Sequence, residues 1–275
     1  MKDIGIIGIG RVGGLLAYNL LSKGYNVKAN DVVESYARGQ VLDLKHAFAF
    51  SNVSVEFAKI EEMLDSKVIV ITAGFPRVPN ETRANLMSRN RTVIQSILEK
   101  LSGYGGTIIT VTNPVDAINT LAAEKFGREK AFGFGNTLDT ARLVSITGGA
   151  LDFVIGEHGE NFVPILSNKN TDRDNIVEKV RSENQFVVEN KKGTEYAPAY
   201  HLAELASAIA EGGEFTTYVS VLCNGEFGVD GISIGVPVRI RAGKLHSISE
   251  CHLDDWERNR FVMGVESIKK AVMQK

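Results

Sequence analysis

Residues 4–13 read Ile4-Gly5-Ile6-Ile7-Gly8-Ile9-Gly10-Arg11-Val12-Gly13. An apolar strand here runs directly into the pattern G-x-G-x-x-G, and a helical pattern opened by Arg11 and Val12 follows. In such a turn Gly8 permits the sharp reversal, Gly10 lets the backbone approach a pyrophosphate, and Gly13 lets the helix pack closely on the strand. The free N–H groups at the start of the helix then face the phosphates. The stretch therefore predicts a dinucleotide-binding turn at the start of an α/β fold.

The second predicted strand ends at Asn30-Asp31, about twenty residues after the glycines. A carboxylate at this place can bind both ribose hydroxyls of an adenosine, and it would repel a 2′-phosphate. Asp31 therefore favours NAD over NADP as the cofactor. The alternative is that Asp31 caps the next turn and that the glycines serve only packing.

The first half of the chain alternates short apolar strands with amphipathic helices. The predicted strands cover residues 3–8, 26–30, 68–73, 107–112 and 131–134, and the predicted helices cover residues 12–22, 35–47, 82–101, 115–126 and 137–147. This order is typical of a Rossmann-type, doubly wound parallel sheet with helices on both faces. We predict that it forms a dinucleotide-binding domain of residues 1–138.

The second half changes character and predicts an α+β substrate or catalytic domain of residues 139–275. Helices are expected at 175–190 and 196–211, and strands at 219–223, 235–241 and 244–248, the last pair forming a hairpin. Asp254 and Glu257 predict a capping box for a last helix that ends near Met273. No flexible linker separates the halves, so we expect them to share an interface, where ligand sites commonly form.

The composition of the chain excludes several classes of function. With 275 residues, of which 44% are hydrophobic and 23% charged, it is typical of a globular protein. The net charge of −2 and the lack of a dense Lys/Arg stripe give no electrostatic basis for binding nucleic acid or an anionic membrane. No apolar run has the length of a bilayer span, and the start lacks an export cleavage pattern, so we expect a cytoplasmic protein. Cys223 and Cys251 lack metal-ligand spacing, so we expect reduced thiols and no metal.

One histidine stands in a setting suited to catalysis, within Ile155-Gly156-Glu157-His158-Gly159-Glu160. An apolar run precedes it and glycines flank it, so a tight turn at a strand end would direct His158 toward a cleft. Histidine is the side chain best suited to passing a proton near neutral pH. The other histidines lack this setting and are expected to be helix, hairpin or surface residues: His46, His201, His246 and His252.

The segment Leu138-Asp139-Thr140-Ala141-Arg142 places an acid and a base three residues apart on one helical face. One interpretation is an exposed ion pair that contributes little to stability. The other separates the tasks of the two residues. Asp139 would accept a hydrogen bond from a ring nitrogen of His158, and Arg142 would hold a substrate carboxylate with a two-pronged hydrogen bond.

Two further segments place polar side chains at the carboxyl ends of predicted strands, where ligands bind in this architecture. The Asn113 amide could bind a substrate and a nicotinamide, or it could cap the next helix with Pro114 at the first position. Arg77 and Arg83 lie in the loop after the third predicted strand, and closure of that loop over a ligand would bring both inward. The alternative is that both are ordinary surface arginines.

Taken together, these motifs resemble the lactate/malate dehydrogenase family, and most closely the malate dehydrogenases of archaea. They cover nearly the whole chain in order: G-x-G-x-x-G, Asn30-Asp31, Ala-Gly-x-Pro-Arg with Arg83, Thr-Asn-Pro-Val-Asp, Leu-Asp-x-x-Arg and Gly-Glu-His-Gly. By that resemblance His158 is the proton donor and acceptor, and Asp139 is its partner. Arg142 binds the carboxylate beside the reacting carbon, Arg83 polarises the carbonyl, and Asn113 lines the site.

The resemblance places the substrate-discriminating position on Arg77. The lactate branch typically has glutamine there, whereas arginine can pair with a second, distal carboxylate. Pyruvate would leave Arg77 unpaired in a closed, water-poor site, so a dicarboxylate such as oxaloacetate is expected instead. The implied activity is malate dehydrogenase, a reversible hydride transfer between (S)-malate or oxaloacetate and NAD(H), by a homodimer or homotetramer.

Three alternatives remain open from the sequence. The first is a dehydrogenase of another 2-hydroxy acid such as lactate, with Arg77 turned to solvent. The second is an NAD-dependent glycoside hydrolase, which would need metal ligands near the nicotinamide. The third is an NAD-binding regulator without turnover, although the set of Asp139, Arg142 and His158 speaks against it. Residues 148–155 and 167–175 also form shorter connections than is usual for the family, which could alter subunit contacts.

Overall fold

The computed structural model describes residues 3–76, 83–168 and 170–273, and of Arg83 and Ala84 only the backbone. The first half contains the strands β1 (Asp3–Ile7), β2 (Asn26–Asn30), β3 (Val55–Phe57), β4 (Val68–Ile71), β5 (Thr107–Thr110) and β6 (Ala131–Gly133). Its helices are α1 (Arg11–Ser22), α2 (Glu34–Ala47), α3 (Arg83–Lys100), α4 (Val115–Phe126) and α5 (Asn136–Thr147), with a 3-10 turn η1 (Ile60–Met63).

The second half mixes antiparallel strands with long helices. Its strands are β7 (Phe153–Gly156), β8 (Phe162–Ile165), β9 (Glu214–Asn224), β10 (Asp230–Arg241) and β11 (Lys244–Ile248). Its helices are α6 (Arg173–Lys191), α7 (Tyr196–Glu211) and α8 (Asp255–Met273), with a 3-10 turn η2 (Glu226–Gly228). No helix in the described part of the chain is both long and apolar enough to cross a bilayer.

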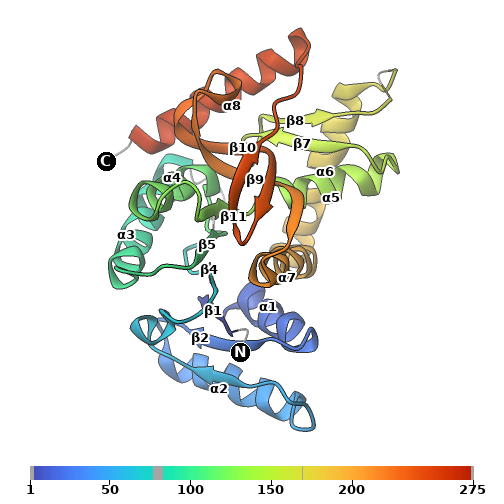
Figure 1. Ribbon diagram of the computed structural model, residues 1–275. Helices are drawn as coiled ribbons and strands as arrows, with labels where there is room; N and C mark the ends of the chain where they lie inside the picture. Colours follow the sequence, from blue (N-terminus) through green and yellow to red (C-terminus); the bar gives the residue numbers. More distant parts are fainter. Residues whose placement is uncertain (1–2, 77–82, 169, 274–275) are drawn as a thin grey trace.

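The strands of the described residues form one sheet in the order β3-β2-β1-β4-β5-β6-β9-β10-β7-β8, with β11 paired to β10 (Figure 1). The pairs from β3 to β6 are parallel, and those from β6 to β8 are antiparallel. The prediction of a doubly wound parallel sheet followed by an α+β domain is therefore confirmed. The two parts are continuous through one residue pair, Gly133 with Ser220.

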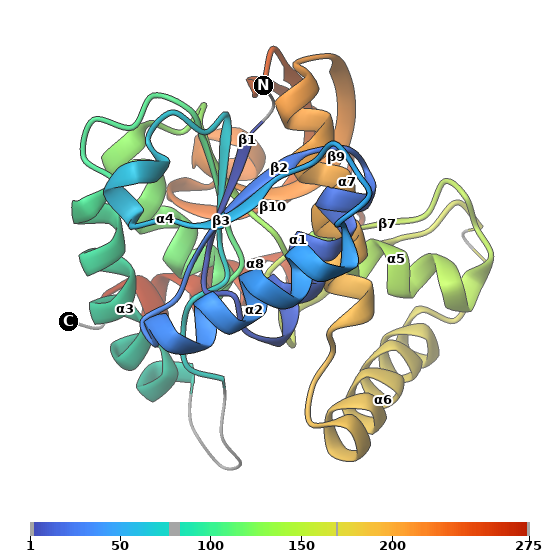
Figure 2. The ribbon, with the colours of Figure 1, turned by 90° about the horizontal axis from the view of Figure 1, so that it is seen from below.

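The two faces of the parallel strands have separate cores, because successive side chains of a strand point to opposite faces. On one face, Ile4 and Ile6 of β1 and Val70 of β4 share a core with helices α1, α2 and α7. On the other face, Ile7 and Ile71 pack with helices α3 and α4. Figure 2 shows these two groups of helices on opposite sides of the strands. Both faces are covered, which explains why these strands read as continuous apolar runs.

Some elements differ from the prediction for identifiable reasons. The hairpin of β10 and β11 and the capping box are confirmed: Asp254 N–H donates to Glu257, and Glu257 N–H donates to Asp254, each at 3.0 Å. Strands β3 and β8 were not predicted, because β3 has only three residues and β8 carries Pro164, which normally argues against a strand. Strand β9 begins before its predicted start, in residues that are exposed or partly exposed. Strand β10 also begins earlier than predicted, although Ile232 and Ile234 are buried there, because glycines on either side of them interrupt the strand pattern.

The glycine turn after β1 is shaped by close backbone contacts. Gly8 has φ +99°, and a Cβ there would lie 2.4 Å from the Ala73 nitrogen. A Cβ on Gly13 would lie 2.1 Å from the Gly8 carbonyl oxygen, whereas a Cβ on Gly10 would meet no atom within 4 Å. Two of the three glycines are thus required for packing, and Gly10 is not.

These contacts separate the effects of two substitutions. We expect Gly13→Ala to lower the free energy of unfolding by about 1–3 kcal/mol, because the added methyl group overpacks the turn. Gly10→Ala is the matched control and should change it by less than about 0.5 kcal/mol. Urea unfolding followed by circular dichroism measures both. Equal midpoints for the two variants would contradict this account of the turn.

Candidate active site

The turn between β1 and α1 fits a dinucleotide phosphate. Gly10 is the residue before the first turn of α1, and the space beside it is open, so a ligand can approach the backbone there. The Gly8 N–H donates to the Asn30 carbonyl at 2.8 Å, which brings the turn next to the end of β2 and to Asp31. Asp31 is partly exposed and accepts from the Val33 N–H at 3.2 Å. Oδ1 of Asp31 caps this turn, whereas its second carboxylate oxygen takes no part in it. Capping of the turn and binding of the ribose hydroxyls are therefore compatible at this position.

Arg11 and Val12 begin α1, so their backbone N–H groups lie at its amino end. The side chain of Arg11 extends elsewhere: its Nε donates to Glu195 Oε2 at 2.6 Å. A role for Arg11 in phosphate binding therefore rests on its backbone. The sequence offered no sign of this contact, which joins residues 184 positions apart.

The structure brings together the residues predicted to pass a proton. His158 lies in the turn after β7, and its Nδ1 is 2.6 Å from Asp139 Oδ2 on α5. Burial opposes the imidazolium, but the charge and hydrogen bond of Asp139 raise the pKa of His158 above its usual value. Burial likewise opposes the Asp139 carboxylate, yet His158 and Arg142 hold the pKa of Asp139 below its usual range. Asp139 therefore stays ionised and favours protonated His158.

Arg142 completes this arrangement. Its Nη1 donates to Asp139 Oδ1 at 3.0 Å, so the two oxygens of Asp139 are engaged by two different partners. The side chain of Asp139 is 7% exposed and that of Arg142 is 22% exposed. The pair is thus not the exposed ion pair of the first interpretation, and the carboxylate is largely removed from water.

Several buried groups that were not predicted as site residues hold the turn of His158. Asp116 Oδ2 accepts from the His158 backbone N–H at 2.9 Å, and burial raises the pKa of Asp116 to about 6. The Asn136 amide donates to the Gly156 carbonyl at 3.0 Å. A Cβ on Gly135 would lie 2.5 Å from the His158 ring, so only glycine permits this packing. Asp116 belongs to the quoted motif Thr-Asn-Pro-Val-Asp, which was the available signal.

Asn113 lies at the carboxyl end of β5 and is exposed, as predicted for a ligand-facing residue. The alternative that it caps α4 is wrong, because α4 begins at Val115 with Pro114 as its N-cap and no side-chain cap bond. The buried amide of Asn90 donates to the Asn113 carbonyl at 2.7 Å and accepts from the Phe75 N–H at 2.7 Å. Asn90 thus joins the loops after β4 and β5. The available signal was helical spacing, because Asn90 shares a face of α3 with the buried apolar residues Met87 and Ile94.

The two arginines of the loop after β4 are only partly described. Arg77 lies outside the described residues. Arg83 is the first residue of α3, and its side chain also lies outside the description. Their roles in binding a substrate remain predictions from the sequence.

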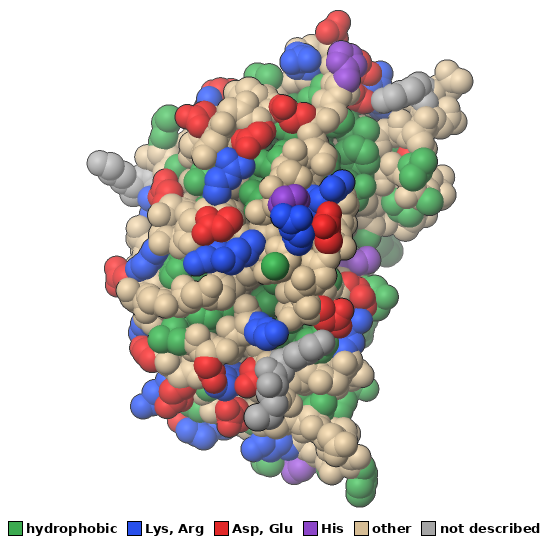
Figure 3. Space-filling model, viewed as in Figure 1, with side chains coloured by type: hydrophobic (Ala, Val, Ile, Leu, Met, Phe, Trp, Pro, Cys, Tyr) green, Lys and Arg blue, Asp and Glu red, His purple; other side chains and the backbone are tan. Residues whose placement is uncertain are grey.

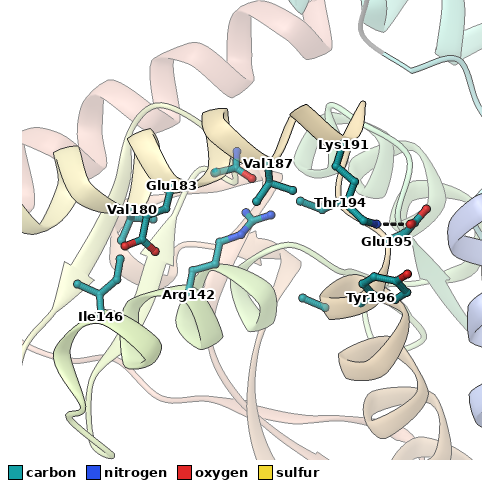
Figure 4. Close-up of a pocket in the computed structure, with 11 residues that line it drawn as sticks. Arg142, Ile146, Val180, Glu183, Val187, Lys191, Thr194, Glu195 and Tyr196 are labelled. Atoms are coloured by element: carbon teal, nitrogen blue, oxygen red, sulfur yellow. Dashed lines mark hydrogen bonds and ion pairs between the residues drawn. The ribbon is translucent and has the colours of Figure 1, made fainter. Parts of the chain in front are cut away.

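A pocket of about 320 Å³ lies between α5, α6 and the start of α7. Figure 4 shows Arg142 extending from α5 toward Val187 of α6 and toward Thr194. Arg142 therefore links the pocket to Asp139 and, through it, to His158. The visible face in Figure 3 carries Lys and Arg side chains interspersed with Asp and Glu side chains, in keeping with the small net charge. Within the described ranges, no group of three or more His, Cys, Asp or Glu side chains has a metal-binding arrangement.

Two family models match the chain. The NAD binding domain of lactate/malate dehydrogenase matches residues 2–133, and the alpha/beta C-terminal domain of lactate/malate dehydrogenase matches residues 152–275. The chain belongs to the lactate/malate dehydrogenase family. The cofactor is accordingly NAD(H), and the family consists of NAD-dependent oxidoreductases of 2-hydroxy acids. The two matches leave open where the domains divide, so the boundary between residues 138 and 139 stays a prediction.

Members of both branches of the family are similar to the chain. The L-lactate dehydrogenase of Halalkalibacterium halodurans is 32% identical, over 98% of this chain and 96% of that protein. The structure of Archaeoglobus fulgidus malate dehydrogenase in complex with NADH has a TM-score of 0.89 and 27% identity, covering 98% of each chain. A lactate dehydrogenase from a Medee basin deep-sea metagenome has a TM-score of 0.90 and 25% identity, covering 99% of this chain and 98% of that one.

The position of Asp31 predicts the effect of removing its charge. We expect Asp31→Ser to bring the affinities for NADPH and NADH closer by roughly tenfold, because the repulsion of a 2′-phosphate is lost. The serine oxygen can still accept from Val33, so the turn should persist. Fluorescence titration with both cofactors measures the ratio. Asp43→Ser, which removes an exposed charge from α2, is the control, and an equal change in both variants would move the discrimination elsewhere.

Proposed function

We propose that the chain is an NAD-dependent malate dehydrogenase that interconverts (S)-malate and oxaloacetate. The observation that supports a 2-hydroxy acid dehydrogenase most is the buried carboxylate of Asp139, which contacts His158 and Arg142 at once. Such a group orients a proton-passing imidazole and places a guanidinium beside it, which a 2-hydroxy acid requires. The choice of malate within that class rests on Arg77 alone. Arg77, by its place in the sequence, supplies the cation for a second carboxylate.

The proposed proton path follows from the tautomer that Asp139 imposes. Its carboxylate accepts from Nδ1, so Nε2 of His158 is the nitrogen that exchanges a proton with the substrate oxygen. When bound, the cofactor supplies the hydride for reduction and accepts it in oxidation. Protonated His158 gives its proton to the carbonyl oxygen of oxaloacetate, and neutral His158 takes the proton from malate. Asp139 remains charged in both directions and stabilises the imidazolium.

The remaining roles concern binding and orientation. Arg142 holds the carboxylate next to the reacting carbon, and its partly exposed guanidinium borders the 320 Å³ pocket. Asn113 lines the site from the end of β5, and Arg83 polarises the carbonyl. These groups hold the substrate near the imidazole, which is the main contribution of binding to the rate. A homodimeric or homotetrameric state and a cytoplasmic location complete the proposal.

A second candidate is a lactate dehydrogenase. It is favoured by the names of similar curated proteins, among them the L-lactate dehydrogenase of Shouchella clausii, which is 30% identical over 98% of this chain and 94% of that protein. The two candidates share the His158–Asp139 pair and Arg142, and they differ in the use of Arg77. Substrate preference therefore decides between them.

The raised pKa of His158 predicts the pH dependence of oxaloacetate reduction. Reduction of oxaloacetate needs protonated His158, so its kcat/KM should fall as the pH rises through that raised pKa. Asp139→Asn removes the charge that raises the pKa while burial still lowers it, so the fall should begin at a lower pH. The rate at pH 7.5 should drop by about 10²–10⁴-fold. Stopped-flow measurement from pH 5 to 9 tests this, with Asp255→Asn in the first turn of α8 as control. An unchanged profile would remove Asp139 from the proton relay.

The substrate class is tested by steady-state turnover of oxaloacetate and pyruvate with NADH. The wild-type chain should prefer oxaloacetate, because Arg77 is left without an anion when pyruvate binds. Arg77→Gln should lower kcat/KM for oxaloacetate by about 2–4 kcal/mol in transition-state free energy and leave pyruvate nearly unaffected. A wild-type preference for pyruvate would instead establish the second candidate.

A further inference from the structure

The first residue of α1 makes three contacts with the segment that joins α6 to α7. Arg11 Nε donates to Glu195 Oε2 at 2.6 Å, Nη1 donates to the Lys192 carbonyl at 3.0 Å, and Nη2 donates to the Lys191 carbonyl at 3.2 Å. Arg11 directly follows Gly10 of the phosphate-binding turn. One side chain thus connects the cofactor-binding part of the chain to the carboxyl-terminal end of α6.

Glu195 receives a second cation on its other oxygen. The Lys191 ammonium donates to Glu195 Oε1, and it also lies 4.1 Å from the centre of the Tyr196 ring. Hydrogen bonds from Arg11 and Lys191 lower the pKa of Glu195, so this carboxylate is ionised. Its side chain is only 15% exposed, whereas that of Arg11 is 50% exposed. The contacts therefore restrain the segment more than an isolated surface ion pair would.

The restrained segment forms one wall of the pocket that Arg142 enters. Lys191, Thr194 and Glu195 line the pocket opposite Arg142, and the dashed line in Figure 4 marks the contact of Lys191 with Glu195. An ionised carboxylate in this wall would repel an anionic substrate if no cation accompanied it. Arg11 and Lys191 supply two cations, so the wall presents no net negative charge at this point.

We propose that Arg11 is a positioning residue that couples the phosphate-binding turn to the substrate pocket by fixing and neutralising Glu195. The proposal rests on the proposed function, because it assumes that a 2-oxo acid enters the pocket of Arg142. The backbone of Arg11 would face the phosphates of a bound cofactor, and its side chain holds the pocket wall, so an ordered turn and an ordered wall favour each other. By linkage, the effect is reciprocal: the cofactor strengthens substrate binding and the substrate strengthens cofactor binding.

The first test measures the wall without turnover. Amide hydrogen exchange of residues 191–196 is compared in the cofactor-free wild type, Arg11→Gln and Arg11→Lys. The segment should exchange about fivefold faster in Arg11→Gln, because three contacts are lost. Arg11→Lys keeps the charge but not the forked donors, so its rate should lie between the other two. Arg38→Gln, which breaks the exposed 2.7 Å pair with Glu34 on α2, is the matched control and should leave the segment unchanged.

The second test asks whether Arg11 acts on the substrate through Glu195. Arg11→Gln should raise KM for oxaloacetate about fivefold while kcat changes less than twofold. In a Glu195→Gln background, the same substitution should raise KM less than about twofold, since the charge to be neutralised is gone. Additive effects in the double variant, or unchanged exchange in Arg11→Gln, would overturn the proposal. Absence of turnover in the wild type would refute the proposed function instead, and the exchange rates would still decide whether Arg11 holds the wall.

Discussion

The hydrogen bond between His158 and Asp139 is the interaction on which the rest of the site depends. A carboxylate that is 7% exposed stays charged only if cations accompany it, and here His158 and Arg142 meet its two oxygens. Two neighbours of Asp139 on α5 tie that helix to β7: Asn136 donates to the Gly156 carbonyl, and Thr140 Oγ1 accepts from the Val154 N–H at 2.9 Å. The helix and the strand are therefore fixed on either side of the acid, and the turn after β7 carries the imidazole to it.

The described cations around the pocket are already paired before any substrate arrives. Arg142 contacts Asp139, while Arg11 and Lys191 contact Glu195. Such pairing lowers the cost of holding guanidinium and ammonium groups in a partly enclosed space. It also fixes where they point, so less side-chain entropy is lost when an anion binds. An anion must then compete with, or share, these contacts. Affinity consequently depends on the geometry of each pair as well as on the number of positive charges.

Local patterns were sufficient to predict most of the parallel half, because a strand that is buried on both faces must be almost continuously apolar. The glycine turn, the hairpin at β11 and the pairing of His158 with Asp139 followed from short motifs. The parts that were missed depend on partners distant in sequence. The side chains of Asn90 and Asp116 hydrogen-bond to loop backbone that only the folded chain places beside them. The sequences of β3 and β8 do not differ enough from those of loops to predict strands. The motif predicted that Arg11 binds phosphate, whereas its side chain donates a hydrogen bond to Glu195 in the other half of the chain.

The seam between β6 and β9 has a consequence for dissecting the chain. A single pair, Gly133 with Ser220, continues the sheet there, and a Cβ on Gly133 would lie 2.8 Å from that of Ser220. Cutting the polypeptide after β6 would remove β9 from the edge of β6. The unpaired strand edge could then pair with other molecules. The same cut would remove α7 from its place over α1 and uncover apolar surface. The amino-terminal half, though matched by its own family profile, is thus unsuited to preparation as a free-standing fragment.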